Sequence, residues 1–591
     1  MPLYTVDFET EAIVGNPTID PPEPVGVAIK HEDHPGQYFP MNEDTAHILR
    51  ALWDDPDAEL LFHNAPFDLC VAEKHLGLKM PPWERVHDTM FLLYLRDPYS
   101  HSLSLKPSAE RYLNVPPDEQ DRLKEWILTH VREAKEKDWG AYIARAPFEI
   151  VEPYAIGDVD RTKALYDHLL PDINLEPYNR ERELMPILIR ATQKGIRVDR
   201  ERLLKDYPIW CGWLDWVTHL IRVRLESPSL NPGSGPQLAA ALDRLDLVTE
   251  WKLTPTGRKS TKKEYLLDSI KDPNLLAMLL YRSTLDTCLG TFYLSWIDKS
   301  EQDGRVHPNW NAIRSTEGRR KGTRTGRLSS DNPNFQNVPT EFSFEIPEGL
   351  PPLPQMRDYV LPEEGHVWLK RDFSSQEIRI LAHFEDGTLM EAYIDDPGMD
   401  PHALAQELML QATYVEYPRK AVKITAFLIV YGGGIPALSQ QLHRPPDEAA
   451  KLRSAYYNAF PGVKTLGNDT KRRGDSGQPI QTWGGRLYYA EPSKIINGYY
   501  RDFGYKLLNY LIQGSAADQT KQCLIDWHNA RPEEDIFMAT VHDEINISVP
   551  IERKEEGMRV LREAMDQKLF DVPMRSEGFC GTTWHQLEGM D

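Results

Sequence analysis

The stretch 367–384, VWLKRDFSSQEIRILAHF, constrains the fold more than any other part of this chain. Apolar and polar residues alternate up to Asp372, which predicts a β-strand ending on a carboxylate. Ser374 stands three residues before Glu377, the spacing of a capping box, and apolar residues then recur at helical intervals. We therefore expect Asp372 at a strand-to-helix corner, with Ser374 capping the helix; taken alone, this corner fits a surface turn as well as a metal site.

A second stretch, 536–549 (IFMATVHDEINISV), favours the metal site. Apolar residues alternate on both sides of His542, Asp543 and Glu544, which predicts a β-hairpin with two acids at its tip. Two acidic corners could share a pair of divalent cations, because carboxylate oxygens are the ligands that hard cations prefer.

Four motifs carry a resemblance to a known family. Residues 372–379, DFSSQEIR, resemble motif A of family A DNA polymerases, the bacterial DNA polymerase I group, and 541–544, VHDE, resemble its motif C. Residues 418–432 resemble its motif B, a helix on which Arg419, Lys423, Phe427 and Tyr431 step by four. The upstream signature of the family matches 325–330, TGRLSS, followed by Asn334, Gln336, Asn337 and Pro339. The motifs follow the family's order and span most of the chain.

The N-terminal part carries a second set of acids. Asp7 and Glu9 are two apart on a predicted strand, so their side chains leave the same face. Tyr154 precedes Asp158 by four residues and would share its helical face. With Asp68 in the run 62–68, these pieces resemble the three motifs of the tyrosine-containing DEDD proofreading exonucleases. The alternative is a packed tyrosine and solvated surface acids.

Composition bounds the class. The chain has 591 residues, too many for one core, and five cysteines without regular spacing, which suggests neither a zinc site nor a disulfide framework. It shows no leader and no apolar run long enough for a membrane span, so we expect a cytoplasmic protein. The net charge of −22 opposes phosphate binding, but basic clusters at 258–263, 319–327 and 471–473 favour a local DNA channel on an acidic body.

The resemblance implies a fold and a division of the chain. The expected fold is a multidomain α/β protein, an RNase H-like 3′-5′ exonuclease domain followed by a right-hand polymerase. The expected parts are listed by residue: exonuclease 1–175, thumb 176–315, first palm part 316–395, fingers 396–505, second palm part 506–591.

The resemblance also implies roles. In polymerisation, Asp372, Asp543 and the Phe373 carbonyl would hold two Mg²⁺ ions, for which Mn²⁺ can substitute, and Glu544 would assist. Asp7, Glu9, Asp68 and Asp158 would hold two more for the exonuclease, where Tyr154 orients the attacking water. Incoming dNTPs would meet Arg419, Lys423, Phe427, Tyr431, His402 and Glu377, the last as steric gate against a ribose 2′ hydroxyl. Primer-template DNA would meet Arg327, Gln513, His542, Asn334 and Gln336.

These roles predict a monomeric, proofreading DNA polymerase with unknown replisome partners. Phe427 predicts poor use of dideoxynucleotides, while Ser375 and Gln376 depart from the commonest motif A and leave fine substrate choice open. The chain begins at the exonuclease strand, without room for a 5′ nuclease ahead, which favours a phage replicative enzyme in the host cytoplasm. Three alternatives stay open: an exonuclease whose second half only binds DNA, a single-subunit RNA polymerase, and a non-catalytic scaffold.

Overall fold

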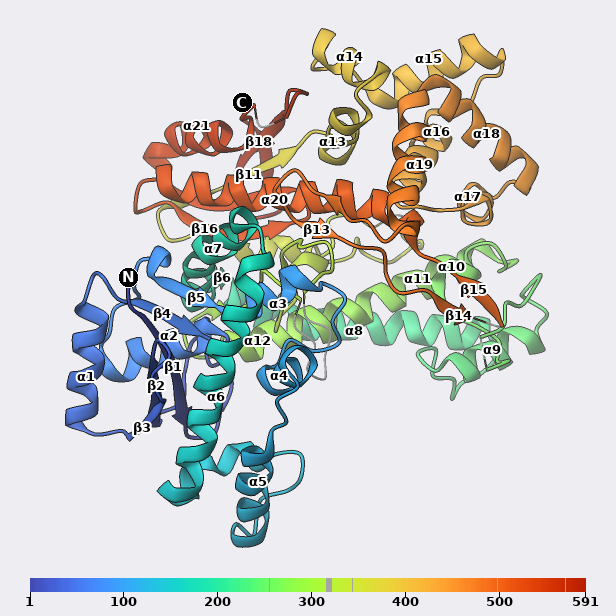
Figure 1. The fold of residues 1–591 in the computed structure, drawn as a ribbon. Helices are drawn as coiled ribbons and strands as arrows, with labels where there is room; N and C mark the ends of the chain where they lie inside the picture. Colours follow the sequence, from blue (N-terminus) through green and yellow to red (C-terminus); the bar gives the residue numbers. More distant parts are fainter. Residues whose placement is uncertain (255, 315–321, 343, 497, 569, 591) are drawn as a thin grey trace.

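A computed structural model describes residues 1–254, 256–314, 322–342, 344–496, 498–568 and 570–590. Arg319, Arg320 and Lys321 of the predicted basic cluster lie outside the described residues. The chain is a mixed α/β protein of several parts, as predicted, with the N-terminal domain below and a second sheet-centred part above it (Figure 1). No helix among the described residues is long and apolar enough to cross a membrane.

The N-terminal domain is built on a five-stranded mixed sheet in the order β3-β2-β1-β4-β5. β1 pairs antiparallel with β2 and parallel with β4. Helix α6 packs on β1 and β2 and carries the second half of the predicted exonuclease set. The strands are β1 (Leu3–Thr10), β2 (Pro24–His31), β3 (Gln37–Pro40), β4 (Glu59–Phe62) and β5 (Val86–Asp88). The helices are α1 (Glu43–Asp54), α2 (Ala65–Leu76), α3 (Thr89–Arg96), α4 (Leu105–Leu113), α5 (Asp118–His130) and α6 (Phe148–Leu169).

Helix α7 (Leu175–Lys194) joins the two parts of the molecule. Its residues Tyr178 and Met185 belong to the apolar core of the N-terminal domain, whereas Leu184 and Leu188 belong to the large core that follows. A buried ion pair fastens this helix to α20 (Leu507–Ala530), because Lys521 Nζ lies 2.5 Å from a Glu181 carboxylate oxygen. The predicted boundary at residue 176 thus falls on a helix that packs into both cores.

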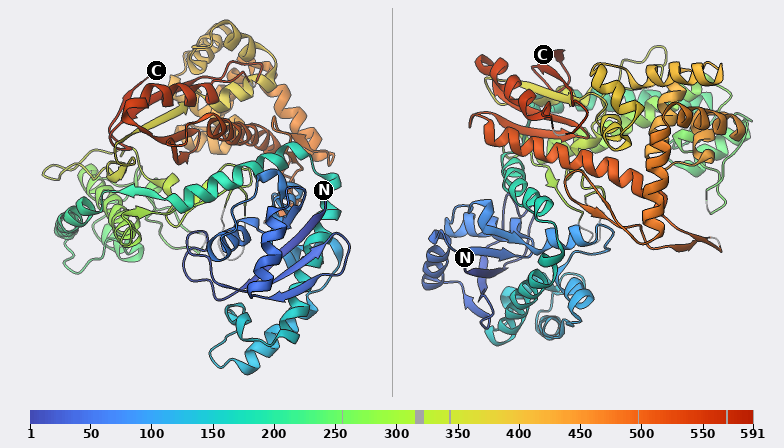
Figure 2. Two further views of the ribbon diagram at one scale, coloured as in Figure 1. Left: turned by 90° about the vertical axis from the view of Figure 1, so that its left-hand side faces the viewer. Right: turned by 45° about the horizontal axis from the view of Figure 1, so that its top comes forward.

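Residues of the predicted thumb are mainly helical and extend to one side of the molecule (Figures 1 and 2). The long helices α8 and α11 pack against each other. The elements from here to the central sheet are α8 (Arg200–Arg224), α9 (Gly235–Arg244), α10 (Lys263–Leu266), α11 (Pro273–Thr287), α12 (Ser295–Lys299), β6 (Ile196–Val198), β7 (Arg305–Val306), β8 (Asn309–Asn311), β9 (Ser329–Asp331) and β10 (Val360–Leu361).

An antiparallel five-stranded sheet, ordered β16-β17-β11-β18-β19, forms the centre of the second part. Its middle strand β11 (His366–Phe373) is followed by α13 (Gln376–Glu385), so Asp372 lies at a strand-to-helix corner as predicted. Helix α21 (Lys554–Met565) packs on β11 and against α20. The other strands are β16 (Ile536–Val541), β17 (Glu544–Pro550), β18 (Ser576–Gly581) and β19 (Leu587–Gly589).

The predicted capping box is wrong. The residue that caps α13 is Ser375, in the left-handed region at φ 58°, and it makes no side-chain cap. The Ser374 hydroxyl donates instead to a Glu577 carboxylate oxygen at 3.3 Å. Glu377 is engaged elsewhere, in an ion pair with Arg327, so the residue that the pattern assigned to a cap is used in the pocket.

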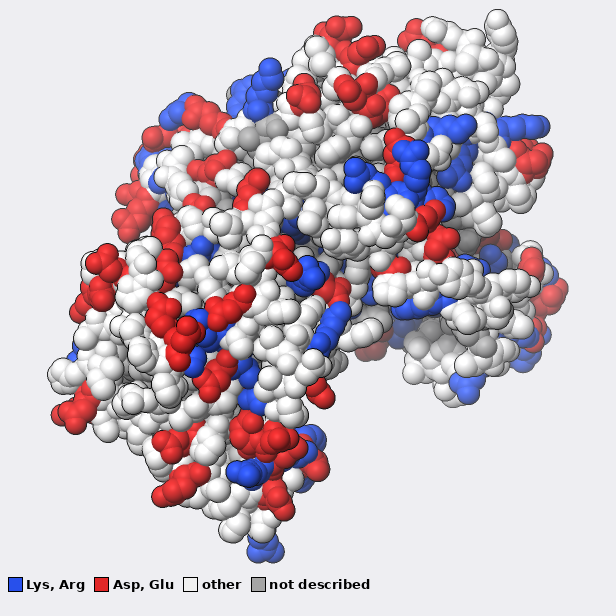
Figure 3. Space-filling view, in the orientation of Figure 1, with Lys and Arg blue, Asp and Glu red and all other residues white. Residues whose placement is uncertain are grey.

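The predicted fingers region is a group of helices at the upper right of Figure 1. On the face in Figure 3, Lys and Arg side chains gather over these helices, while acidic side chains are spread over much of the rest. The helices are α14 (Thr388–Asp395), α15 (Pro401–Thr413), α16 (Arg419–Val430), α17 (Ile435–Leu442), α18 (Pro446–Ala459) and α19 (Pro461–Asp475). Two short hairpins, β12 (Ile480–Gln481) with β13 (Leu487–Tyr488) and β14 (Lys494–Ile496) with β15 (Tyr499–Arg501), connect them to α20.

Candidate active sites

The first acidic site lies where β1, α2 and α6 meet. Carboxylate oxygens of Asp7, Glu9 and Asp158 lie within 4.8 Å of one another, a group that could hold a metal ion. Asp68 is not part of that group but is held beside it, because its Oδ1 accepts a hydrogen bond from the Phe8 backbone N at 3.0 Å. Tyr154 lies one turn before Asp158 on α6, as predicted. The four acids and the tyrosine therefore converge on one end of the sheet.

Burial and crowding raise the pKa of every carboxyl in this site. The pKa of Asp7 is raised to about 7 by burial and by the nearby Asp158 carboxylate. Burial, followed by neighbouring carboxylates, also raises the pKa of Glu9 and Asp68 well above their usual values. Glu9 Oε1 and Asp158 Oδ1 are buried without a hydrogen-bond partner among the described residues. Clustered buried carboxylates with unused oxygens are the donor set that a divalent cation requires.

Two positioning residues in this site were not found from the sequence. Lys106 on α4 donates from Nζ to Asp158 Oδ2 at 2.7 Å and lies 3.9 Å from the centroid of the Tyr154 ring. Asp88 accepts hydrogen bonds from the backbone N of Asn64 and Ala65, and so fixes the turn that opens α2 and carries Asp68. Neither residue had a sequence signal, because their partners are distant along the chain.

The second acidic site lies at the edge of the central sheet. The β16–β17 hairpin is present as predicted, with His542 in the left-handed region at φ 58° and Asp543 beside it in the turn. The turn is held against the end of β11, because the Phe373 N donates to the Asp543 carbonyl at 3.3 Å. Burial, then the Asp543 carboxylate, raises the pKa of Asp372 to about 7, and burial raises that of Asp543 to about 6.

Glu544 differs from the two aspartates in that its carboxylate is already bound. Lys370 Nζ lies 2.5 Å from Glu544 Oε2, and the Asn546 amide donates to Glu544 Oε1 at 3.0 Å. Lys370 also lies 3.6 Å from Asp372 Oδ2. Among the described residues, Asp372, Asp543 and Glu544 do not form a group as compact as the N-terminal one. Asp372 and Asp543 are thus the acids with oxygens available for a cation.

A cavity of about 320 Å³ opens beside these aspartates, between the central sheet and α16. Its lining includes Asp543, Glu377, Phe427 and Tyr431. The Tyr431 hydroxyl donates to a Glu377 carboxylate oxygen at 3.1 Å, and Arg327 pairs with the other oxygen. Glu377 is therefore fixed at the cavity wall by one cation and one hydroxyl.

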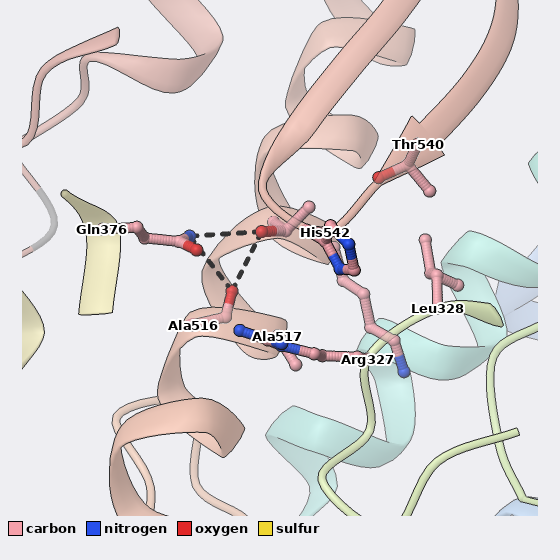
Figure 4. A pocket seen from close by; sticks show the side chains of 9 residues that line it. Arg327, Leu328, Gln376, Ala516, Ala517, Thr540 and His542 are labelled. Atoms are coloured by element: carbon pink, nitrogen blue, oxygen red, sulfur yellow. Dashed lines mark hydrogen bonds between the residues drawn. The ribbon is translucent and has the colours of Figure 1, made fainter. Parts of the chain in front are cut away.

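Residues behind this cavity hold its wall in place. Gln376 points from α13 toward α20, where its amide donates to the Gln519 side chain at 2.9 Å and to the Ala516 carbonyl at 3.3 Å. Figure 4 shows this contact with Arg327 and His542 on the other side of a smaller adjoining pocket. Gln336 donates to the backbone carbonyls of Leu328 and Thr540, so it links the loop before Arg327's strand partner to the hairpin. Asn334 is exposed and caps this loop through the Gln336 N.

Helix α16 places the predicted nucleotide-binding side chains in a row. The Phe427 and Tyr431 rings are stacked with centroids 6.3 Å apart, and Lys423 Nζ lies 5.9 Å from the Phe427 centroid. His402 is buried with its ring 6.0 Å from that of Phe427, and burial lowers its pKa to about 4. Arg419 at the start of the helix pairs with Asp400 at 2.6 Å, a contact that the sequence did not indicate.

Comparison with known proteins identifies the chain. The model of the family "DNA polymerase family A" matches residues 219–586, and that of a "3'-5' exonuclease" matches residues 6–174. The chain belongs to DNA polymerase family A. The two acidic sites of this polymerase fall in the two matched regions, one in each.

Relatives cover the polymerase to different extents. DNA polymerase DpoZ of Vibrio phage phiVC8 is 26% identical, over 96% of this chain and 93% of its own length. DNA polymerase I of Caldicellulosiruptor bescii is 28% identical over 85% of this chain, which spans only 58% of that relative. The fold resembles the "POL domain of Pol1 from M. smegmatis complex with DNA primer-template and dNTP", with a TM-score of 0.78 at 23% identity, covering 98% of this chain and 96% of the other.

Proposed function

We propose that this polymerase extends a DNA primer on a DNA template with dNTPs, and removes misincorporated nucleotides with its N-terminal 3′-5′ exonuclease. The observation that carries the proposal is the cavity beside Asp372 and Asp543, which is bounded on its far side by the stacked rings of Phe427 and Tyr431. A base can stack on such rings while its phosphates extend toward Lys423 and Arg419.

Two carboxylates at the sheet edge suit Mg²⁺, for which Mn²⁺ can substitute. Bound there, divalent ions would lower the pKa of the primer 3′ hydroxyl and stabilise the pyrophosphate that leaves. Asp372 and Asp543 would hold the ions, together with the Phe373 carbonyl, and Lys423 and Arg419 would neutralise charge that develops on the phosphates. Glu544 has a supporting role, because its oxygens bind Lys370 and Asn546 and thereby orient the strand that carries Asp372.

Glu377 is proposed as the gate against ribonucleotides. Its carboxylate is buried at the cavity wall, and its two partners prevent it from swinging away from an incoming sugar. A 2′ hydroxyl placed against it would meet occupied oxygens and lose its hydration without a new partner. Arg327, Gln513 and His542 border the same region, and there they would contact the primer-template, with Asn334 and Gln336 shaping the loop behind.

In the exonuclease, Asp7, Glu9, Asp68 and Asp158 would hold two ions, and Tyr154 would orient the attacking water. The Tyr154 ring is fixed by Lys106 on one side and stands at a T-shaped angle to Trp139 on the other. A replicative role in a phage is proposed because the phage relative matches over nearly its whole length, whereas the bacterial relative matches over little more than half. The protein would then act as a monomer in the host cytoplasm, and its replisome partners are not indicated.

The test is extension of a labelled primer with Mg²⁺, comparing wild type with Asp543→Ala, Asp7→Ala and the control Asp571→Asn, which removes an acid that pairs only with His383. We expect wild type and the control to extend and to trim, Asp543→Ala to trim only, and Asp7→Ala to extend only. A wild type that degrades in every condition, with an inert Asp7→Ala, would leave a nuclease whose second half only binds DNA. Extension with rNTPs but not dNTPs would support the RNA polymerase alternative.

A further inference from the structure

The β14–β15 hairpin exposes large side chains that no described element covers. Tyr499 and Tyr500 are 74% and 75% exposed, and Ile495 is 76% exposed. The strands pair antiparallel, Lys494 with Arg501, Ile495 with Tyr500 and Ile496 with Tyr499. A two-stranded ribbon that buries neither face gains little stability of its own, so its exposed aromatic residues require another explanation.

The two faces of the ribbon differ in character. Residues directly opposite each other share a face, and faces alternate along a strand. Lys494, Ile496, Tyr499 and Arg501 therefore lie on one face, which combines a tyrosine with two cations, while Ile495 and Tyr500 lie on the other. Neither Lys494 nor Arg501 has an ion-pair partner among the residues that the structure describes. Aromatic rings flanked by free cations match the bases and phosphates of a single nucleic-acid strand.

The base of the hairpin is connected to the nucleotide cavity. A Cβ placed on Gly432, the residue after Tyr431, would lie 3.1 Å from the Tyr505 ring, so Tyr505 packs against the end of α16. Tyr505 is itself 42% exposed, and its ring lies 6.5 Å from that of Phe503, which follows β15 closely. Aromatic residues thus continue from the cavity, through Tyr431 and Tyr505, toward the hairpin. In Figure 1 and in the right view of Figure 2, the hairpin projects beyond the end of α20.

We propose that the β14–β15 hairpin and Tyr505 form a stacking platform for the unpaired template strand ahead of the polymerase cavity. Template bases stack on Tyr505, Tyr499 and Tyr500, and Lys494 and Arg501 contact the phosphates. This inference rests on the proposed polymerase function, because only a template strand has unpaired bases that must reach that cavity. Duplex DNA is a poor occupant, because its bases are not available to exposed rings.

The experiment measures affinity for primer-templates by fluorescence anisotropy, with either a long single-stranded template overhang or a one-nucleotide overhang. The variants are Tyr499→Ala/Tyr500→Ala and Lys494→Ala/Arg501→Ala, with Tyr414→Ala as control, a tyrosine 91% exposed at the end of α15. We expect the tyrosine pair to weaken binding of the long overhang by about tenfold, since one stacked base is worth about 1–3 kcal/mol. The cation pair is expected to lower the slope of log K against log salt by about 1.4, roughly 0.7 per phosphate contact. Affinity for the one-nucleotide overhang, and extension at saturating DNA, should not change.

Equal losses on both substrates would overturn the platform, as would no loss on either. A loss that occurs only when a displaced non-template strand is present would assign the hairpin to that strand instead. Sedimentation of wild type provides a third outcome: a dimer that the tyrosine pair abolishes would make the hairpin a contact between copies of this chain. A wild type that binds the long overhang but never extends would refute the proposed function and leave the platform standing.

Discussion

Replacing Lys106 with Met should destabilise the metal-free exonuclease domain and make its stability depend on Mg²⁺. Lys106 Nζ is the cation that contacts Asp158, and the ammonium is largely buried beside carboxylates whose pKa values burial has already raised. Removing one partner of a buried ion pair costs about 3–5 kcal/mol. Because Asp7 has a pKa of about 7, protonation near neutral pH relieves part of this cost, and we expect about 3 kcal/mol.

The assay is thermal unfolding in chelator and in saturating Mg²⁺. For a domain of this size, about 3 kcal/mol corresponds to a fall in Tm of about 6–12 °C in chelator, and Mg²⁺ should remove most of the difference because it supplies the missing positive charge. The control is Lys163→Met on α6, whose ammonium is paired at 2.7 Å with the half-exposed Asp167 outside the site. Its cost should be about 0–1 kcal/mol. The reasoning is refuted if the two variants melt alike in chelator, or if Mg²⁺ does not narrow the gap for Lys106→Met.

Three further outcomes follow from buried or paired groups elsewhere. Burial lowers the pKa of His87 to about 3 although Glu59 lies 3.6 Å away; the unfolded chain then takes up a proton below about pH 6.5 that the folded one does not, so stability falls with pH, by about 2 kcal/mol at pH 5, and calorimetry of His87→Gln should show a shallower fall. Asp400→Asn keeps the cap of α15 but frees Arg419, and steady-state kinetics should show a KM for dNTP up to about fivefold lower at unchanged kcat. Lys521→Met should cost about 3–5 kcal/mol in denaturant unfolding, and Glu181→Leu in the same chain should recover most of it, whereas additive losses would contradict a buried pair.

The sequence predicted the elements that carry the chemistry because those elements have strong local signals. The alternation before Asp372 and on both sides of Asp543 defines β11 and the β16–β17 hairpin, and both lie where the pattern placed them. The step of four residues along α16 likewise brought Phe427 and Tyr431 onto one face. In each case the period of a strand or helix fixes the direction of the side chain, so local sequence suffices.

Contacts between distant segments were beyond such reasoning. Arg327 and Glu377 were assigned to different ligands, the minor groove and the sugar, yet they pair with each other. Asp400 and Arg419 lie on different elements, and Lys106 reaches Asp158 across the N-terminal domain. Hydrophobic periodicity gives the face on which a side chain lies but not its partner, because the partner depends on how separate elements pack.

Both acidic sites combine clustered carboxylates with a lysine from an adjacent position. In the N-terminal domain Lys106 contacts Asp158, and in the central sheet Lys370 contacts Glu544 and lies 3.6 Å from Asp372. Lys370 precedes Asp372 by two residues on β11, so strand alternation places them on the same face. Buried carboxylates without any cation would protonate or destabilise the fold. An internal ammonium keeps such a cluster folded, and it leaves oxygens of Asp7, Glu9 and Asp543 for a divalent ion to bind.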